Sequence, residues 1–153
     1  MTVYGMDIVR SEDAAVDHFF GPEDIVQVAG EVDYLIIVAP NTPQTHNIVN
    51  EKVLSAMKPT AFLVNIARGE LVDEDALLQA LRKGTIAGAA LDAFVQEPLP
   101  SDHPFWNMKN VIVTSHVGGR SDIYIEQTLP IIEENLRRFV AGKTDDLINL
   151  VAG

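Results

Sequence analysis

The sequence predicts an α/β protein built on a parallel, doubly wound sheet. Three observations predict it: short runs that are apolar on both faces, stretches with helical spacing between them, and a regular alternation of the two along the 153 residues. Runs that are apolar on both faces are typical of strands covered by helices. Alternating strands and helices indicate parallel strands joined by crossover helices.

The apolar runs give five predicted strands. The clearest is YLIIVA at residues 34–39, an unbroken apolar run. The full set is Thr2–Met6, Tyr34–Ala39, Ala61–Ile66, Ile86–Leu91 and Val111–Thr114. Residues 95–109 contain Pro98, Pro100 and Pro104 and are predicted to form one long loop of the kind that often serves function.

Helical spacing fills the intervals between the strands. In the third predicted helix the leucines share one face, acidic residues occupy the first turn, and Arg82, Lys83 and Gly84 end it, as dipole and capping rules require. Pro130 is expected to kink the last helix or to set its start. The predicted helices are Pro22–Gly30, Asn50–Met57, Asp73–Arg82 and Ser121–Val140.

Composition excludes several classes of function. There are 22 acidic and 11 basic side chains, and a net charge of −11 repels nucleic acid and anionic lipid. No apolar run approaches the roughly 20 residues of a membrane span, and the first residues do not resemble a signal peptide. The absence of cysteine fits a cytoplasmic protein, and the four histidines lack the spacing of metal ligands.

The glycine-rich loop of a dinucleotide-binding domain is missing from the sequence. A Rossmann unit begins with a strand, a G-x-G-x-x-G loop and a helix, and its second strand ends in an acid that binds ribose. Here the first predicted strand already ends in Asp7, and no such glycine pattern occurs. We therefore expect an incomplete Rossmann-type doubly wound sheet, with a long C-terminal helix, in a chain that starts after the phosphate loop.

Four segments carry a family resemblance. NIARGELVDE at 65–74 is similar to the N-x-A-R-G-x-x-V-D-E signature of the D-isomer-specific 2-hydroxyacid dehydrogenases, whose members include glyoxylate/hydroxypyruvate reductases and phosphoglycerate dehydrogenases. GAALDAF with the following Glu97–Pro98, DHPFW at 102–106 and TSHVGG at 114–119 come next in the family's order. The resemblance implies a partial NAD(P)-binding domain at 1–120. Residues 121–153 would be a helix and tail that return to a substrate domain absent here.

The resemblance also implies an oxidoreductase that transfers hydride between NAD(P)H and a small 2-oxo acid. Arg68 resembles the residue that binds the substrate carboxylate, a task suited to a permanently charged guanidinium. His116 resembles the acid/base, because imidazole exchanges protons near neutral pH. Glu97 resembles the carboxylate that pairs with this imidazole.

Cofactor contacts are expected at the strand ends. Asp7 favours NAD by bonding ribose hydroxyls, whereas Arg10 could pair with the 2′-phosphate of NADP. Asp92 resembles the ligand of the nicotinamide carboxamide. The other expected cofactor residues are Ala39, Pro40, Ile66, Ala67, Arg68, His116, Gly118 and Gly119.

Two further hypotheses remain open at this stage. The chain could be a truncated, inactive fragment that at most binds nucleotide, because the pyrophosphate cradle is missing. It could also pair with a relative, or with itself as a homodimer, through the cofactor domain, as the family resemblance implies. His18 and His46 are predicted to be surface residues, and His103 a residue that packs within its loop.

Overall fold

The computed structural model describes residues 1–10 and 13–150. Residues Met1–Gly118 form one compact unit, and the chain from Gly119 onward forms another. The strands of the first unit are β1 (Tyr4–Met6), β2 (His18–Phe20), β3 (Tyr34–Ile37), β4 (Phe62–Asn65), β5 (Gly88–Leu91) and β6 (Val111–Val113). Its α-helices are α1 (Ile25–Glu31), α2 (Glu51–Ala56) and α3 (Glu74–Lys83), and the second unit contains α4 (Tyr124–Val140).

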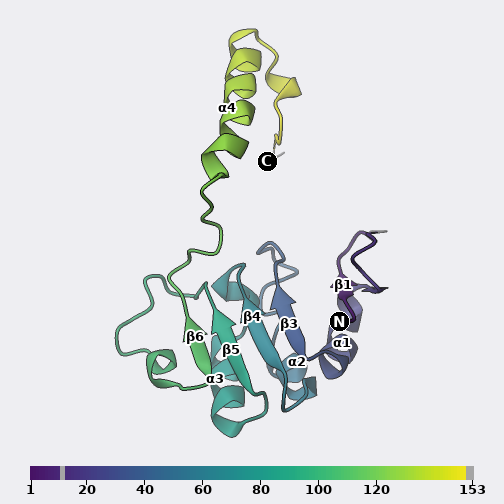
Figure 1. Cartoon of the computed structure of the whole chain (residues 1–153), viewed down its shortest axis with the longest axis vertical. Coiled ribbons are helices and arrows are strands. Elements are labelled where there is room, and N and C mark those ends of the chain that lie inside the picture. Colours follow the sequence, from purple (N-terminus) through teal and green to yellow (C-terminus); the bar gives the residue numbers. More distant parts are fainter. Residues whose placement is uncertain (11–12, 151–153) are drawn as a thin grey trace. The chain divides into compact units, whose positions relative to one another are not determined.

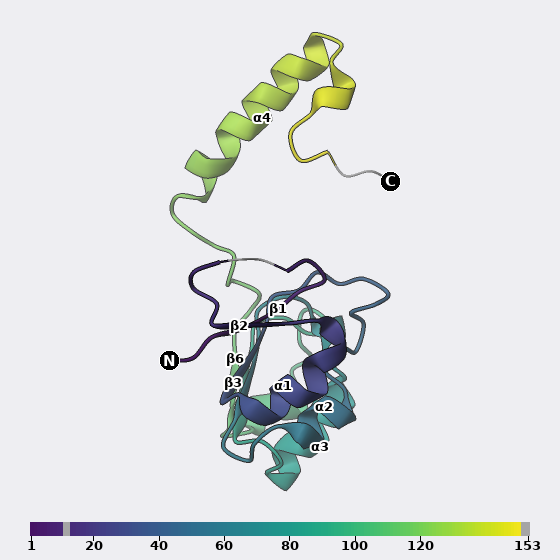
Figure 2. The ribbon, with the colours of Figure 1, turned by 90° about the vertical axis from the view of Figure 1, so that its right-hand side faces the viewer.

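Four parallel strands, in the order β3-β4-β5-β6, form the main sheet (Figure 1). Helices α1, α2 and α3 lie together against one of its faces (Figure 2). Their apolar sides and the inward side chains of the strands, such as Leu35, Leu63 and Leu91, make the core. The α/β class and the parallel sheet predicted from the sequence are confirmed.

The second face of the main sheet is apolar and exposed in the described part of the chain. Strand register places Tyr34 and Ile36 of β3 beside Phe62 and Val64 of β4, and Ile112 of β6 lies further along the same face. Tyr34 and Phe62 stack with their ring centroids 5.9 Å apart. Tyr34, Ile36, Phe62 and Ile112 are all exposed.

The strands β1 and β2 form a separate parallel pair, in register from Tyr4 and His18 onward. The Tyr4 hydroxyl donates to Glu31 at the end of α1 (3.2 Å). The sequence did not predict β2, because three residues beside a run rich in acidic groups carry too short an apolar signal.

Helix α3 shows why the local sequence folds as predicted. The Asp73 carboxylate accepts a hydrogen bond from the N–H of Ala76 (3.0 Å), and Gly84 ends the helix with a positive φ of 68°. Leu77, Ala80 and Leu81 face the core. The start of α3 fixes the chain that follows the Arg68 loop, and therefore contributes to the position of that loop.

The second unit consists of α4 and its tail. Helix α4 begins at Tyr124 rather than Ser121 and continues through Pro130, so Pro130 does not set its start. The Asn135 side chain both donates to and accepts from the backbone of Ile148, which ties the tail to the helix. No helix of the described residues is long and apolar enough to cross a membrane.

Replacing Asp73 by Ala is expected to destabilise the protein by about 1 kcal/mol, because the first turn of α3 loses its capping acceptor. Urea unfolding followed by circular dichroism measures this difference. D73N, which keeps a capping oxygen, is the matched control and should unfold close to wild type. Equal losses in D73A and D73N would contradict the capping role.

Candidate active site

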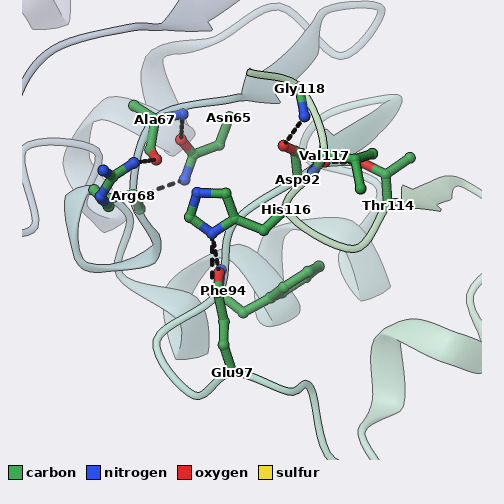
Figure 3. Close-up of polar contacts among 10 residues, drawn as sticks. All are labelled: Asn65, Ala67, Arg68, Asp92, Phe94, Glu97, Thr114, His116, Val117 and Gly118. Carbon is green, nitrogen blue, oxygen red and sulfur yellow. Dashed lines mark hydrogen bonds and ion pairs between the residues drawn. The ribbon is translucent and has the colours of Figure 1, made fainter. Parts of the chain in front are cut away.

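A buried asparagine shapes the loop that carries Arg68. Asn65 ends β4 and is 1 % exposed. Its Oδ1 accepts from the N–H of Ala67 (3.1 Å), and its Nδ2 donates to the carbonyl of Arg68 (2.8 Å). The loop therefore turns sharply at the carboxyl end of the strand and presents the Arg68 side chain there (Figure 3).

Gly69 lets two loops touch. A Cβ at Gly69 would lie 2.0 Å from the carbonyl carbon of Phe94, closer than any non-bonded contact allows. Only glycine therefore permits the Arg68 loop to pack directly on the backbone at residues 94 and 95. This contact brings the segment that leads to Glu97 beside the segment that carries Arg68.

The His116 imidazole is paired with the Glu97 carboxylate. Nδ1 lies 2.8 Å from Glu97 Oε2 and 3.0 Å from Oε1 (Figure 3). Glu97 Oε1 also accepts from the N–H of Phe94 (3.0 Å), which holds the carboxylate in place. Because an ionised carboxylate only accepts, Nδ1 carries the hydrogen. Nε2, which has no hydrogen-bond partner among the described residues, is then the nitrogen available to a substrate.

The electrostatics of Glu97 follow from this pairing. The hydrogen bond with His116 lowers the pKa of Glu97, and the N–H of Phe94 lowers it further against a smaller effect of burial. The positive charge of Arg68 acts in the same direction. Glu97 is therefore ionised at neutral pH.

One open cleft of about 270 Å³ contains all three candidate catalytic residues. Arg68, Glu97 and His116 line it together with Gly69, Glu70, Phe94 and Val95. The cleft thus offers a fixed cation, a proton-exchanging imidazole and a carboxylate that supports the imidazole. A small molecule with a carboxylate next to a carbonyl matches this set of groups.

The expected cofactor residues follow strands of the sheets. Asp7 follows β1 and forms a turn in which its Oδ1 accepts from the N–H of Ile8 (2.6 Å). In the main sheet, Ala39 and Pro40 follow β3, Ile66 and Ala67 follow β4, and Asp92 follows β5. Gly118 closes the first unit, and Gly119 begins the second, which is described by itself. Parallel strands end at one edge, so the residues of the main sheet share that edge.

Asp92 makes contacts that the sequence did not predict. Its carboxylate is buried and accepts from the Thr114 hydroxyl and from the N–H groups of Val117 (3.0 Å) and Gly118 (2.8 Å). The family motifs contain Thr114 and Asn65 but assign them no role. The signal that could identify both is a polar residue at the end of an apolar strand.

The remaining histidines lie outside the cleft. His18 and His46 are exposed, as predicted. His103 packs in its loop, as predicted: Nδ1 accepts from the N–H of Phe105 (3.3 Å), and Nε2 lies 3.3 Å from Glu74 Oε1. None of the three lines the cleft.

The family described as D-isomer specific 2-hydroxyacid dehydrogenase, NAD binding domain, matches residues 1–118. The chain belongs to this family. It is 50% identical over 95 residues to a glyoxylate/hydroxypyruvate reductase B of Pectobacterium carotovorum, an alignment covering 62% of this chain and 30% of that protein. It is 38% identical over 145 residues to a glyoxylate reductase of Thermococcus onnurineus, covering 92% of this chain and 43% of the relative.

Solved structures agree with the family assignment. A D-isomer specific 2-hydroxyacid dehydrogenase from Xanthobacter autotrophicus, in complex with NADPH and MES, superposes with a TM-score of 0.88 at 36% identity, covering 98% of this chain and 60% of that one. An NADPH-dependent glyoxylate/hydroxypyruvate reductase from Sinorhizobium meliloti, in complex with NADP and sulfate, gives 0.81 at 29% identity, covering 92% and 45%. The chain spans less than half the length of these curated relatives, and the matched part is their NAD-binding domain.

The Glu97–His116 pair is expected to lose its contribution to stability in acid. Because the pKa of Glu97 is lowered by folding, the pair stabilises the folded state above the ordinary pKa of a glutamate. This stabilisation is lost as pH falls through the lowered, folded-state value. Urea unfolding of wild type and E97Q between pH 7 and pH 3 measures it, and the two curves should converge towards low pH.

The matched control for this experiment is E133Q on α4, since Glu133 is exposed and lies outside the cleft. Its difference from wild type should stay small across the same range. An E97Q difference that does not shrink in acid would contradict the ionised pair.

Proposed function

We propose that this chain carries the cofactor-binding and catalytic residues of an NAD(P)H-dependent reductase of small 2-oxo acids, which also oxidises the D-2-hydroxy acid in reverse. The observation that carries the proposal is the cleft in which Arg68, Glu97 and His116 meet. The family membership supports it, and so do the reductases among the relatives.

Arg68 binds the substrate carboxylate. Its guanidinium stays charged at any relevant pH and can hold a carboxylate through two parallel N–H bonds. Nη1 donates to the carbonyl of Ala67 (2.7 Å), which limits the motion of the guanidinium. A 2-oxo acid held in this way has its carbonyl group at a fixed distance from the guanidinium, within the cleft that the His116 imidazole also lines.

His116 supplies or accepts the proton. In the reductive direction, hydride for the carbonyl carbon would come from the nicotinamide of a bound cofactor. The carbonyl oxygen takes its proton from Nε2 of the charged imidazole, and the Glu97 carboxylate at Nδ1 stabilises that charge. In the oxidative direction the neutral imidazole accepts the hydroxyl proton. Glu97 positions the ring throughout and remains ionised.

The cofactor fits the residues at the strand ends. Asp7 has one carboxylate oxygen engaged in its turn, which leaves the other for ribose hydroxyls. Asp92 accepts a single hydrogen bond at Oδ2, so a carboxamide N–H can be added there. Ala39, Pro40, Ile66, Ala67, Gly118 and Gly119 are proposed to contact the cofactor through backbone or small side chains. NAD is proposed on the charge of Asp7, with NADP as the alternative through Arg10.

A second candidate is a catalytically inactive chain that at most binds nucleotide or pairs with another chain. The exposed apolar face at Tyr34, Ile36, Phe62 and Ile112 favours it, because such a face is usually covered in a complete domain. A homodimer through the cofactor domain belongs to the same set of proposals. A cytoplasmic location is proposed from the absence of cysteine.

Turnover tests the first candidate directly. Oxidation of NADH by glyoxylate, hydroxypyruvate or pyruvate is expected with the purified chain, and H116Q should lower kcat by about 10² to 10⁴ fold, since it removes the proton donor. H46Q is the matched control, because His46 is exposed outside the cleft, and it should retain wild-type rates. A folded sample without turnover on any of the three acids would favour the inactive candidate.

Cofactor preference tests the role of Asp7. Calorimetry is expected to show tighter binding of NADH than of NADPH, and D7N should reduce that preference by about tenfold, since a neutral amide no longer repels the 2′-phosphate. D13N is the matched control: Asp13 forms the same kind of turn, with the N–H of Ala15 (2.8 Å), without following a strand. Tighter binding of NADPH by the wild type would overturn the assignment of NAD.

A further inference from the structure

The carboxylate of Asp92 holds the segment on which His116 lies. Asp92 directly follows β5, is 5 % exposed, and points at the chain that leaves β6. Its Oδ1 accepts from the Thr114 hydroxyl and from the N–H of Val117, and its Oδ2 accepts from the N–H of Gly118 (Figure 3). His116 therefore lies between residues that Asp92 holds: Thr114 before it, and Val117 and Gly118 after it.

The backbone of His116 needs this support. Its φ is +54°, in the left-handed region that L-residues other than glycine seldom occupy. Such a conformation persists only where surrounding contacts determine it. The two consecutive N–H groups of Val117 and Gly118 converge on one carboxylate, which requires the chain to turn at the residue before them. The turn directs the imidazole towards Glu97, where Nδ1 makes its 2.8 Å contact.

The close packing of this segment also depends on Asp92. A Cβ at Gly118 would lie 2.9 Å from Asp92 Oδ2, so the backbone approaches the carboxylate as closely as glycine allows. Burial raises the pKa of Asp92, but the hydrogen bonds from Thr114, Val117 and Gly118 outweigh burial and leave the pKa below its usual value. The acceptor is therefore a full carboxylate at neutral pH, which makes the bonds to it strong ones.

We propose that Asp92 and Thr114 are positioning residues, which hold the backbone of residues 115–118 and so place the His116 imidazole against Glu97. The consequence for catalysis rests on the proposed function, but the geometric role does not. The positioning role is compatible with the expected contact of Asp92 with the cofactor, because Oδ2 accepts only one hydrogen bond from the chain.

Isosteric variants separate this role from simple packing. In D92N one carboxylate oxygen becomes an amide nitrogen, which donates rather than accepts. At the Oδ2 position this nitrogen would face the N–H of Gly118, and at the Oδ1 position it would face the Thr114 hydroxyl and the N–H of Val117. At least one bond to the segment must break. In T114V the hydroxyl becomes a methyl group of similar volume, whereas T114S keeps the hydroxyl and serves as the conservative rescue.

The experiment is nuclear magnetic resonance on the complete chain with uniform ¹⁵N labelling. Two readouts are recorded: exchange of the Val117 and Gly118 amides with water, and the ring nitrogen signals of His116, which report a hydrogen on Nδ1 held by Glu97. D92N should speed amide exchange by about tenfold or more, the size expected for a lost bond to a charged acceptor, and should abolish the paired ring signature. T114V should change both in the same direction, and T114S should resemble wild type.

The control is E97A. It removes both oxygens that face the ring, so the ring signature should disappear while the Val117 and Gly118 amides stay protected. A D92N protein with an unchanged ring signature overturns the proposal. If D92N does not fold, the comparison of T114V with T114S tests the proposal instead. Equal ring nitrogen signals and equal amide exchange rates in T114V and T114S would also overturn it. Neither readout needs cofactor or substrate, so a failure of the proposed function would leave this result interpretable.

Discussion

The register of three neighbouring strands determines where each part of the cleft begins. Asn65 at the end of β4 pairs with Leu91 at the end of β5, and Leu91 pairs with Val113 at the end of β6. Because the strands are parallel, all three leave the sheet at one level, and the loops that follow have only a few residues in which to diverge. Arg68, Asp92 and His116 lie within three residues of these ends. A shift of one residue in either pairing would exchange the two faces of a strand and displace the loop that follows it.

The sequence was sufficient for the parts of the site that depend on residue type and position in the chain. Arg68 and His116 follow predicted strands, and Glu97 lies in a proline-rich loop, so their presence in one cleft could be expected from topology and from the family motifs. The helix start at Asp73 could also be predicted, because capping is decided by residues three or four positions apart.

Other features depend on contacts between residues far apart in the sequence. The bond between Thr114 and Asp92 joins residues 22 positions apart, and no local pattern specifies it. The left-handed backbone of His116 cannot be predicted from local propensity, which disfavours it. In the structure it accompanies the three hydrogen bonds that Asp92 accepts. Strand β2 could not be predicted because its three residues are too few to show an apolar pattern. Its pairing with β1 supplies the hydrogen bonds that make it a strand.

The exposed face of the main sheet makes any association between copies of this chain sensitive to ionic strength. Tyr34, Ile36, Phe62 and Ile112 present a continuous apolar surface, and burying such a surface against a second copy is favourable. The net charge of −11 opposes that association through long-range repulsion between copies. Salt shortens the range of the repulsion to about 10 Å at 0.1 M and leaves the apolar attraction nearly unchanged. Any association of copies through this face would therefore be opposed in dilute buffer and favoured in concentrated salt. The face that sets this balance carries none of the candidate catalytic residues.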